Sequence, residues 1–286
     1  MSPAAGGASE AVADGPDAGQ TADRILYPLF ERPDELTLEV LRTLAVGIEG
    51  EAIVLDLFTD DRSAKDESGR VAGSVLHSEL EHDPTGTVRP LSTETDHPVG
   101  TLVDLAQTLE PGLVVFDDRI PRSIGDALRG PVTGRVGSAV PCDVVRVSTL
   151  QHVKRISSIL VPIASGPHSD LAARVAGAIG LGGGAVVDLF HVAETADDST
   201  RVRTLFESAM ASLPSEVEVE TWHIESAEVA GEIVAQSNHY DLTVLGNPRK
   251  SRLRRMVAGS VTDEVEQGAN NGVLVARRGD GPGFRV

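Results

Sequence analysis

The sequence is poor in cysteine, in aromatic residues and in long apolar runs. Its 286 residues contain one cysteine, Cys142, which excludes an intrachain disulfide and a cysteine-based zinc or iron–sulfur site. No stretch approaches the roughly 20 apolar residues that a membrane-spanning helix needs. Residues 1–23 lack the basic-then-apolar pattern of a signal peptide. We therefore expect a cytoplasmic protein with no metal site and no membrane insertion.

Lysine is also scarce, since it occurs only at positions 65, 154 and 250, while the net charge is −18. A surface this acidic gains little from neutralising phosphates, which argues against nucleic acid as a partner. The same composition is typical of a salt-loving, haloarchaeal-type cytoplasm, where salt screens charge repulsion.

What the sequence does contain is a pattern that occurs twice. An apolar strand at Ile25 to Phe30 is followed by a helix that starts at Asp34-Glu35 and carries Leu38, Leu41 and Val46. The pattern restarts with a strand at Ile159 to Ile163 and a helix with Ser169-Asp170 as cap and first turn. That second helix has one apolar face, formed by Leu171, Val175 and Ile179.

Each copy continues with alternating strands and helices. In the first copy we expect strands at 52–58, 87–91, 113–116 and 144–147 and helices near 71–80 and 101–109. In the second we expect strands at 185–192, 217–224, 242–245 and 273–276 and helices near 201–211, 228–238 and 259–268. This alternation predicts an α/β fold of two tandem, doubly wound, mostly parallel five-stranded sheets.

The domain limits follow from the repeat. Asp117 precedes Gly130 by the same interval that separates Gly246 from Gly259. We expect domains at 24–149 and 154–278, a boundary near Ser148 to Arg155, a disordered acidic tail at 1–23 and a flexible tail at 279–286.

The loop after Leu245 is the best candidate for a binding site, because ligands of parallel sheets bind beyond the carboxyl ends of the strands. Gly246 and Gly259 allow close approach of backbone, Ser260 offers a hydroxyl, and the following helix start favours an anion. Five cations crowd this loop: Arg249, Lys250, Arg252, Arg254 and Arg255. The alternative is that the glycines only form turns and the arginines form a solvated face.

Three segments of the second copy resemble the universal stress protein family: 159–169 (ILVPIASGPHS), 187–192 (VDLFHV) and 241–277. The family fingerprint is Gly, two residues, Gly, nine residues, Gly, then Ser or Thr. Gly246, Gly259 and Ser260 match it, and Arg249 replaces the middle glycine. The resemblance implies an ATP site, with magnesium possible, at Ile163, Val192, Gly246, Asn247, Arg249, Gly259, Ser260 and Val261.

Two departures weaken that implication. The acidic residue of the family after the first strand is Ala164 here, which removes a ribose or metal contact. Arg249 adds bulk but also a cation for phosphate. The VPxxxGPHS opening is also similar to stress-protein-type domains appended to some archaeal amino-acid permeases.

The first copy resembles the family more faintly, through residues 25–28 and 139–144. Asp117-Asp118 occupy the place of Gly246-Asn247, and two carboxylates repel a polyphosphate. Pro131 replaces Ser260 and removes a hydroxyl and an amide donor. We therefore expect this copy to be a degenerate structural partner.

The leading hypothesis is a regulatory or stress-response protein that binds an adenine nucleotide through its second domain, with no hydrolysis predicted. The alternative is a scaffold of the same fold that binds no nucleotide. An enzyme is a third hypothesis, but the sequence shows no base or metal carboxylate near the loop.

In the family the closing strands of two domains pair across a dimer, so Val144 to Val147 and Val273 to Ala276 are expected to pair within this chain as a pseudo-dimer. A homodimer of the whole chain is left open beside this pseudo-dimer.

Overall fold

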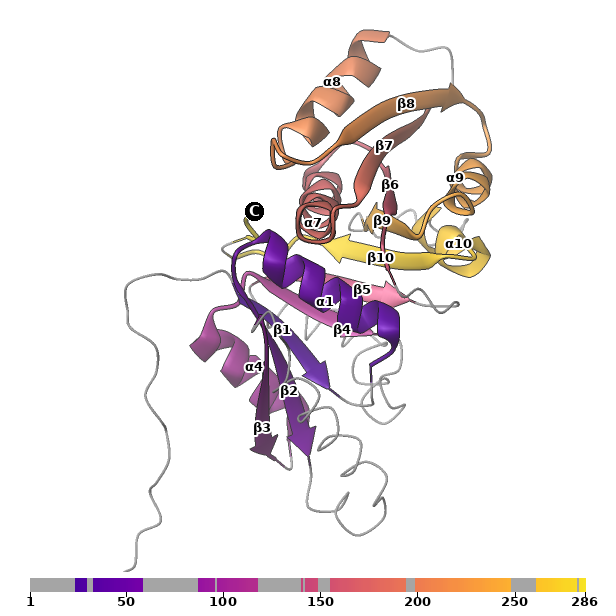
Figure 1. The fold of residues 1–286 in the computed structure, drawn as a ribbon. Helices are drawn as coiled ribbons and strands as arrows, with labels where there is room; N and C mark the ends of the chain where they lie inside the picture. The colour runs from indigo at the N-terminus through magenta and orange to yellow at the C-terminus, as the bar shows by residue number, and fades with distance from the viewer. Residues whose placement is uncertain are drawn as a thin grey trace, which may run out of the picture.

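The two halves share one continuous β-sheet. The computed structural model describes residues 24–29, 33–58, 87–95, 97–117, 140, 142–148, 155–193, 199–247, 261–281 and 283–286. Its ten strands are ordered β3-β2-β1-β4-β5-β10-β9-β6-β7-β8. Read from its outer edge inward, each half has the order 3-2-1-4-5, so the predicted repeat is present in the topology (Figure 1).

In the N-terminal half the described strands are β1 (Arg24–Leu29), β2 (Glu51–Phe58), β3 (Val88–Glu94), β4 (Leu113–Asp117) and β5 (Asp143–Ser148). Its described helices are α1 (Glu35–Gly47) and α4 (Pro98–Leu109). Each described strand agrees with its predicted counterpart to within three residues at either end. The helix predicted near 71–80 and the tail predicted at 1–23 lie outside the described residues.

In the C-terminal half the described strands are β6 (Ser158–Pro162), β7 (Val186–Ala193), β8 (Val219–Glu225), β9 (Leu242–Gly246) and β10 (Gly272–Arg277). The helices are α7 (Pro167–Gly183), α8 (Ser199–Met210), α9 (Val229–Ser237) and α10 (Val261–Gly268). Within the described ranges, none of the helices has both the length and the apolar character that a membrane crossing requires.

The halves meet at an antiparallel pair formed by β5 and β10, with Val147 opposite Leu274 and Val145 opposite Ala276. All other strand pairs among the described residues are parallel. The expected pairing of the two closing strands is therefore present. It turns the two predicted five-stranded sheets into a single ten-stranded sheet.

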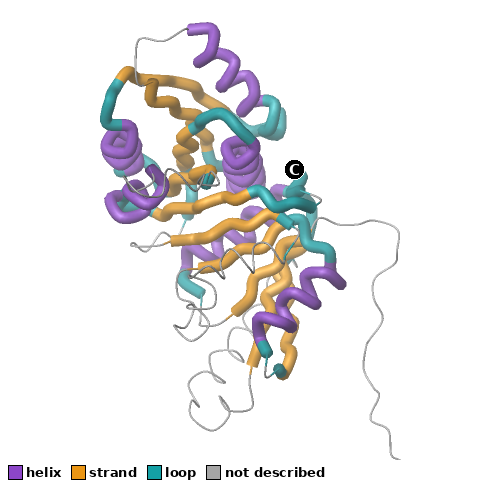
Figure 2. Tube along the Cα trace, turned by 180° about the vertical axis from the view of Figure 1, so that it is seen from behind, coloured by secondary structure: helices purple, strands orange, loops and turns teal. Residues whose placement is uncertain are grey.

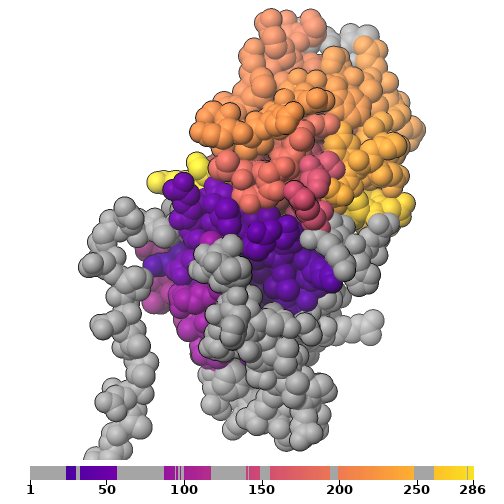
Figure 3. Space-filling view, in the orientation of Figure 1, coloured from indigo at the N-terminus to yellow at the C-terminus, as the bar shows by residue number. Residues whose placement is uncertain are grey.

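Helices cover both faces of this sheet (Figures 1 and 2). Apolar residues of α1, α7 and α8 pack into one core on one face, and this core draws residues from both halves. On the other face, α4 packs over the N-terminal strands, and α9 and α10 pack over the C-terminal strands. In the space-filling view, the indigo residues of the N-terminal half lie directly against the C-terminal half (Figure 3).

Helix α1 begins as the sequence indicates, because the Asp34 side chain accepts a hydrogen bond from the Thr37 amide at 2.7 Å. Its buried face is broader than predicted. Leu41 is fully buried, but Leu38 and Val46 are only partly buried, and Leu36, Val40 and Leu44 are fully or almost fully buried instead. The reason is that α1 contacts α7 as well as the sheet, which rotates and widens its apolar face.

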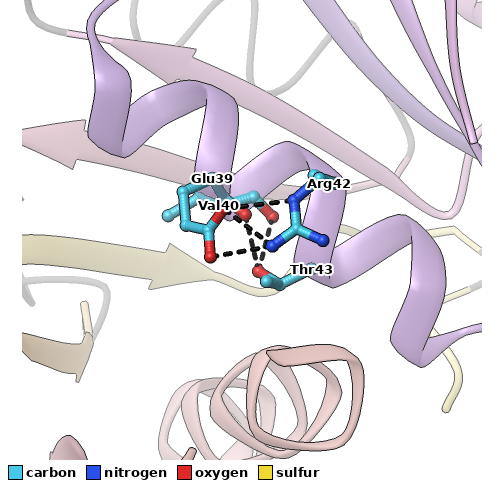
Figure 4. Close-up of polar contacts among 4 residues, drawn as sticks. All are labelled: Glu39, Val40, Arg42 and Thr43. Carbon is cyan, nitrogen blue, oxygen red and sulfur yellow. Dashed lines mark hydrogen bonds and ion pairs between the residues drawn. The ribbon is translucent and has the colours of Figure 1, made fainter. Parts of the chain in front are cut away.

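The contact between α1 and α7 depends on two glycines at equivalent places. A methyl carbon added to Gly47 would lie 1.9 Å from the Ala178 carbonyl oxygen, and one added to Gly182 would lie 1.9 Å from the Thr43 carbonyl oxygen. Thr43 is tolerated in this buried contact because its hydroxyl donates a hydrogen bond to the Glu39 carbonyl oxygen at 2.7 Å. The side chain of Glu39 also forms an ion pair with Arg42 (Figure 4). Backbone therefore packs on backbone where the halves meet.

The C-terminal residues differ from the prediction of a flexible tail at 279–286. Phe284 is fully buried in the core shared by the halves. Its amide donates to Asp143 of β5 at 2.9 Å, and its carbonyl oxygen accepts from Arg174 of α7 at 3.0 Å. A single aromatic residue among glycines and charges forms no periodic pattern, so the sequence did not indicate that Phe284 is buried and hydrogen-bonded.

Replacing Gly182 by alanine tests the helix contact. Because the added methyl cannot fit against the Thr43 carbonyl, the helices must separate. We expect the free energy of unfolding to fall by about 1–3 kcal/mol, measured by urea denaturation. Gly231→Ala in α9 is the control, since its methyl would have its nearest neighbour at 3.8 Å; its stability should stay equal or rise by up to ~1 kcal/mol. A Gly182→Ala protein as stable as the wild type would contradict this packing.

The thiol of Cys142 supplies a second test. Burial raises its pKa to about 12, with a smaller contribution from the neighbouring charge of Asp143. At pH 9 such a thiol is ionised in about one molecule per thousand, whereas an exposed thiol is mostly ionised. We expect iodoacetamide to alkylate the native chain at least roughly a hundredfold more slowly than the urea-unfolded chain.

The sign of the pH effect follows from the same shift. Folding favours the neutral thiol, so its contribution to stability is present below the ordinary thiol pKa and is lost as the pH rises toward 12. Rapid alkylation of the folded protein at pH 9 would show that Cys142 is accessible and not a packing residue.

Candidate functional site

The candidate site lies where the strand order of the C-terminal half reverses. From β6 the chain proceeds outward to β7, whereas β9 lies on the other side of β6 and leads to β10. Loops that leave neighbouring strands in opposite directions open a crevice at their carboxyl ends. Ile163 follows β6, Val192 lies near the end of β7, and Gly246 ends β9. The fold therefore brings these three predicted residues to one edge of the sheet.

Gly246 lies against the first turn of α7. A methyl carbon added there would be 2.6 Å from the carbonyl carbon of His168 and 2.8 Å from the Ser169 nitrogen. Glycine is required here because its backbone packs against the backbone of α7, whereas the sequence predicted close approach to a ligand. The next residue, Asn247, donates its amide to the Ala276 carbonyl oxygen at 2.8 Å. The exit of β9 is thus fixed on two sides.

The loop after β6 is held by hydrogen bonds to its neighbours. The Ile163 amide donates to the Phe190 carbonyl oxygen at 2.8 Å, and Nδ1 of His191 donates to the Ile163 carbonyl oxygen at 3.0 Å. The Ala164 amide donates to the Ser169 hydroxyl at 2.9 Å. These bonds orient the loop, but they also occupy backbone groups that a ligand would otherwise use.

Ser169 therefore has a different role from the predicted helix cap. Helix α7 begins at Pro167, and Gly166 at φ 115° is its N-cap residue. Proline suits the first helical position because it needs no amide partner there, so the helix starts three residues earlier than expected. Ser169 then points back and holds the loop after β6.

Two predicted residues are buried apolar side chains. Ile163 is 5% exposed and Val192 is 7% exposed. Val261 is the first residue of α10 and is 41% exposed. None of the five described candidates carries an ionisable side chain, and α10 has Asp263 and Glu264 in its first turn. Positive charge for an anion must come from the arginine-rich loop.

The remaining predicted residues, Arg249, Gly259 and Ser260, lie outside the described residues. Across the ranges that the structure describes, no three His, Cys, Asp or Glu side chains gather in a way that would hold a metal ion.

His168 and His191 each have a backbone partner. His168 Nδ1 accepts a hydrogen bond from the Arg278 amide at 3.0 Å. Both histidines therefore position the loops that surround the carboxyl ends of β6 and β9. Spacing alone gave no signal of this, because the partners are 28 and 110 residues away.

The equivalent place in the N-terminal half is the end of β4. Asp117 ends this strand where Gly246 ends β9, as the repeat predicted. Asp118 and Pro131, the other departures from the family pattern, lie outside the described residues.

Comparison with known proteins agrees with this architecture. Residues 156–277 match the model of the universal stress protein family. The chain is similar in structure to a universal stress protein from Archaeoglobus fulgidus, with a TM-score of 0.58, 20% identity and coverage of 91% of this chain and 98% of that one. A comparison with curated protein sequences finds no match.

Two further structures are similar over most of the chain. A putative universal stress protein from Pseudomonas aeruginosa has a TM-score of 0.55 and 17% identity, covering 91% of this chain and 94% of its own. The cytoplasmic domain of a prokaryotic cation chloride cotransporter has a TM-score of 0.57 and 14% identity, covering 89% and 95%. At these identities the likeness shows the fold alone. The C-terminal half of the chain, residues 156–277, is therefore a domain of the universal stress protein family, and the N-terminal half repeats its fold.

Proposed function

We propose that the C-terminal half binds an adenine nucleotide, ATP in the first instance, and that the chain is a cytoplasmic stress-response or regulatory protein. The observation that carries this proposal is the reversal of strand order between β6 and β9, with Gly246 at its edge. The loop that follows this edge matches the family fingerprint at Gly246, Gly259 and Ser260, with Arg249 in place of the middle glycine.

The chemistry of each part suits a nucleotide. Ile163 and Val192 lie near the carboxyl ends of β6 and β7 with apolar side chains that are almost fully buried, so a base would contact only their small exposed part. The start of α10 and the arginines of the loop offer donors and positive charge to phosphates. Magnesium, if bound, would be held chiefly by the phosphates. Hydrolysis is not part of the proposal, because the described site residues include no general base.

Ala164 sets a limit on affinity. With no carboxylate after β6, the ribose loses a charged acceptor, and the Ala164 amide is already bonded to Ser169. We therefore propose a nucleotide affinity set mainly by the phosphates, and hence lowered by salt.

Thermal unfolding with MgATP tests the site. A ligand present at about 100 times its Kd adds about 2.7 kcal/mol of stability, so the melting temperature of the wild-type chain should rise by several degrees. Gly259→Val should remove this rise, because a branched side chain at the fingerprint glycine blocks backbone approach to phosphate. Gly231→Ala in α9 should keep it.

The second candidate function is a scaffold or interaction module that binds no nucleotide. Ala164, Arg249 and the aspartates of the N-terminal half favour it, as does the likeness in fold to a transporter's cytoplasmic domain. No rise in melting temperature at millimolar ATP, in the wild type and at low salt, would favour this candidate and contradict the first.

Stoichiometry gives an independent prediction. Because Asp117 and Asp118 stand where Gly246 and Asn247 stand in the C-terminal half, two negative charges would repel a triphosphate from the first half. Isothermal titration should therefore give one nucleotide per chain. A value of two would show that the N-terminal half keeps a working site.

A further inference from the structure

Residues 278–281, 283 and 284, which we call the clasp, join the edge of the candidate site to the N-terminal half. They follow β10 and lie beyond the segment that matches the family model. The C-terminus lies beside α7, between the two halves (Figure 1). The clasp is therefore an addition to the C-terminal domain that contacts both halves.

The clasp closes on one buried carboxylate. Asp143 at the start of β5 is 1% exposed and accepts hydrogen bonds from the amides of Gly279 at 2.8 Å and Phe284 at 2.9 Å. Its third donor is the guanidinium of Arg278 at 3.0 Å. A buried carboxylate is stable only with such partners, so opening the clasp leaves this charge without them.

Packing gives the clasp a defined shape. A methyl carbon added to Gly283 would lie 1.8 Å from Nη1 of Arg278, so the arginine crosses directly over the glycine. The side chain of Phe284 is fully buried in the core that α1 and α7 share. Arg174 of α7 donates to the Phe284 carbonyl oxygen at 3.0 Å.

The other end of the clasp reaches the candidate site. The Arg278 amide donates to Nδ1 of His168 at 3.0 Å, and the His168 carbonyl group packs directly on Gly246. The Asn247 amide donates to the Ala276 carbonyl oxygen, two residues before Arg278. A displacement of Arg278 therefore moves the wall against which Gly246 rests.

We infer that the clasp couples the nucleotide site of the C-terminal half to Asp143 of the N-terminal half and sets the site's affinity. This inference rests on the proposed function. With the clasp closed, His168 holds the exit of β9 in the position that receives phosphate. By linkage, a nucleotide bound there must also hold the clasp closed, with the same factor in both directions.

Hydrogen exchange at the Gly279 and Phe284 amides measures clasp opening directly, because both amides bind Asp143. In the full chain we expect slow exchange, slowed further by roughly fivefold or more when MgATP is bound. Asp143→Asn should speed exchange at least roughly tenfold. It should also weaken ATP binding by the same factor by which bound ATP slows exchange in the wild type. Gly283→Val should do the same by displacing Arg278 without removing the buried charge.

Two variants at His168 separate coupling from simple stability. His168→Leu leaves Asp143 and its donors in place, so exchange without ATP should stay slow, but ATP should no longer slow it. His168→Asn, whose Oδ1 can accept the Arg278 amide, should restore the response. Arg42→Gln is the control. It removes the ion pair between Arg42 and Glu39 on α1, and none of the described hydrogen bonds or ion pairs joins Arg42 to the clasp (Figure 4).

The outcomes distinguish the two proposals. If the wild type binds no ATP, the proposed function and the coupling both fail. If it binds ATP while exchange in the clasp is unchanged, or if Asp143→Asn and Gly283→Val bind ATP as the wild type does, the coupling fails and the proposed function stands.

Discussion

The antiparallel pairing of β5 with β10 is the contact on which the rest of the structure depends. Each of these strands already pairs in parallel with a neighbour of its own half, β4 for β5 and β9 for β10. Because the fifth strand of each half pairs with another strand on both of its sides, the two sheets form one continuous sheet. The helices on either side of the join then lie close enough to share a core.

This shared core makes each half part of the packing of the other. Residues of α1, α7 and the clasp are buried together, so the N-terminal half contributes to the packing of the C-terminal half. Asp143 shows the same dependence. It belongs to β5, yet the described partners of its carboxylate all follow β10. The described part of the N-terminal half thus contributes contacts that hold the C-terminal half in place.

The sequence predicted most of the fold because strand and helix periods are local. Leu171, Val175 and Ile179 are buried as their spacing indicated, and the repeat predicted two halves of the same order. It could not reveal that α1 would bury a wider face or that Phe284 would enter the core, because both depend on residues far away in the chain. It placed Ile163, Val192 and Gly246 at one edge, but missed the links of His168 and Ser169, since a side chain bonded to backbone leaves no spacing pattern.

The use of both closing strands inside the chain leaves β3 and β8 as the outer strands of the described sheet. Neither edge invites another strand. β3 contains Pro90, which has no amide hydrogen to donate, and β8 exposes Glu220 and Glu225. A second copy added edge to edge would bring these carboxylates toward its own charges in a chain that is already strongly acidic. Growth of the described sheet by edge-to-edge pairing is therefore disfavoured at both of its outer strands.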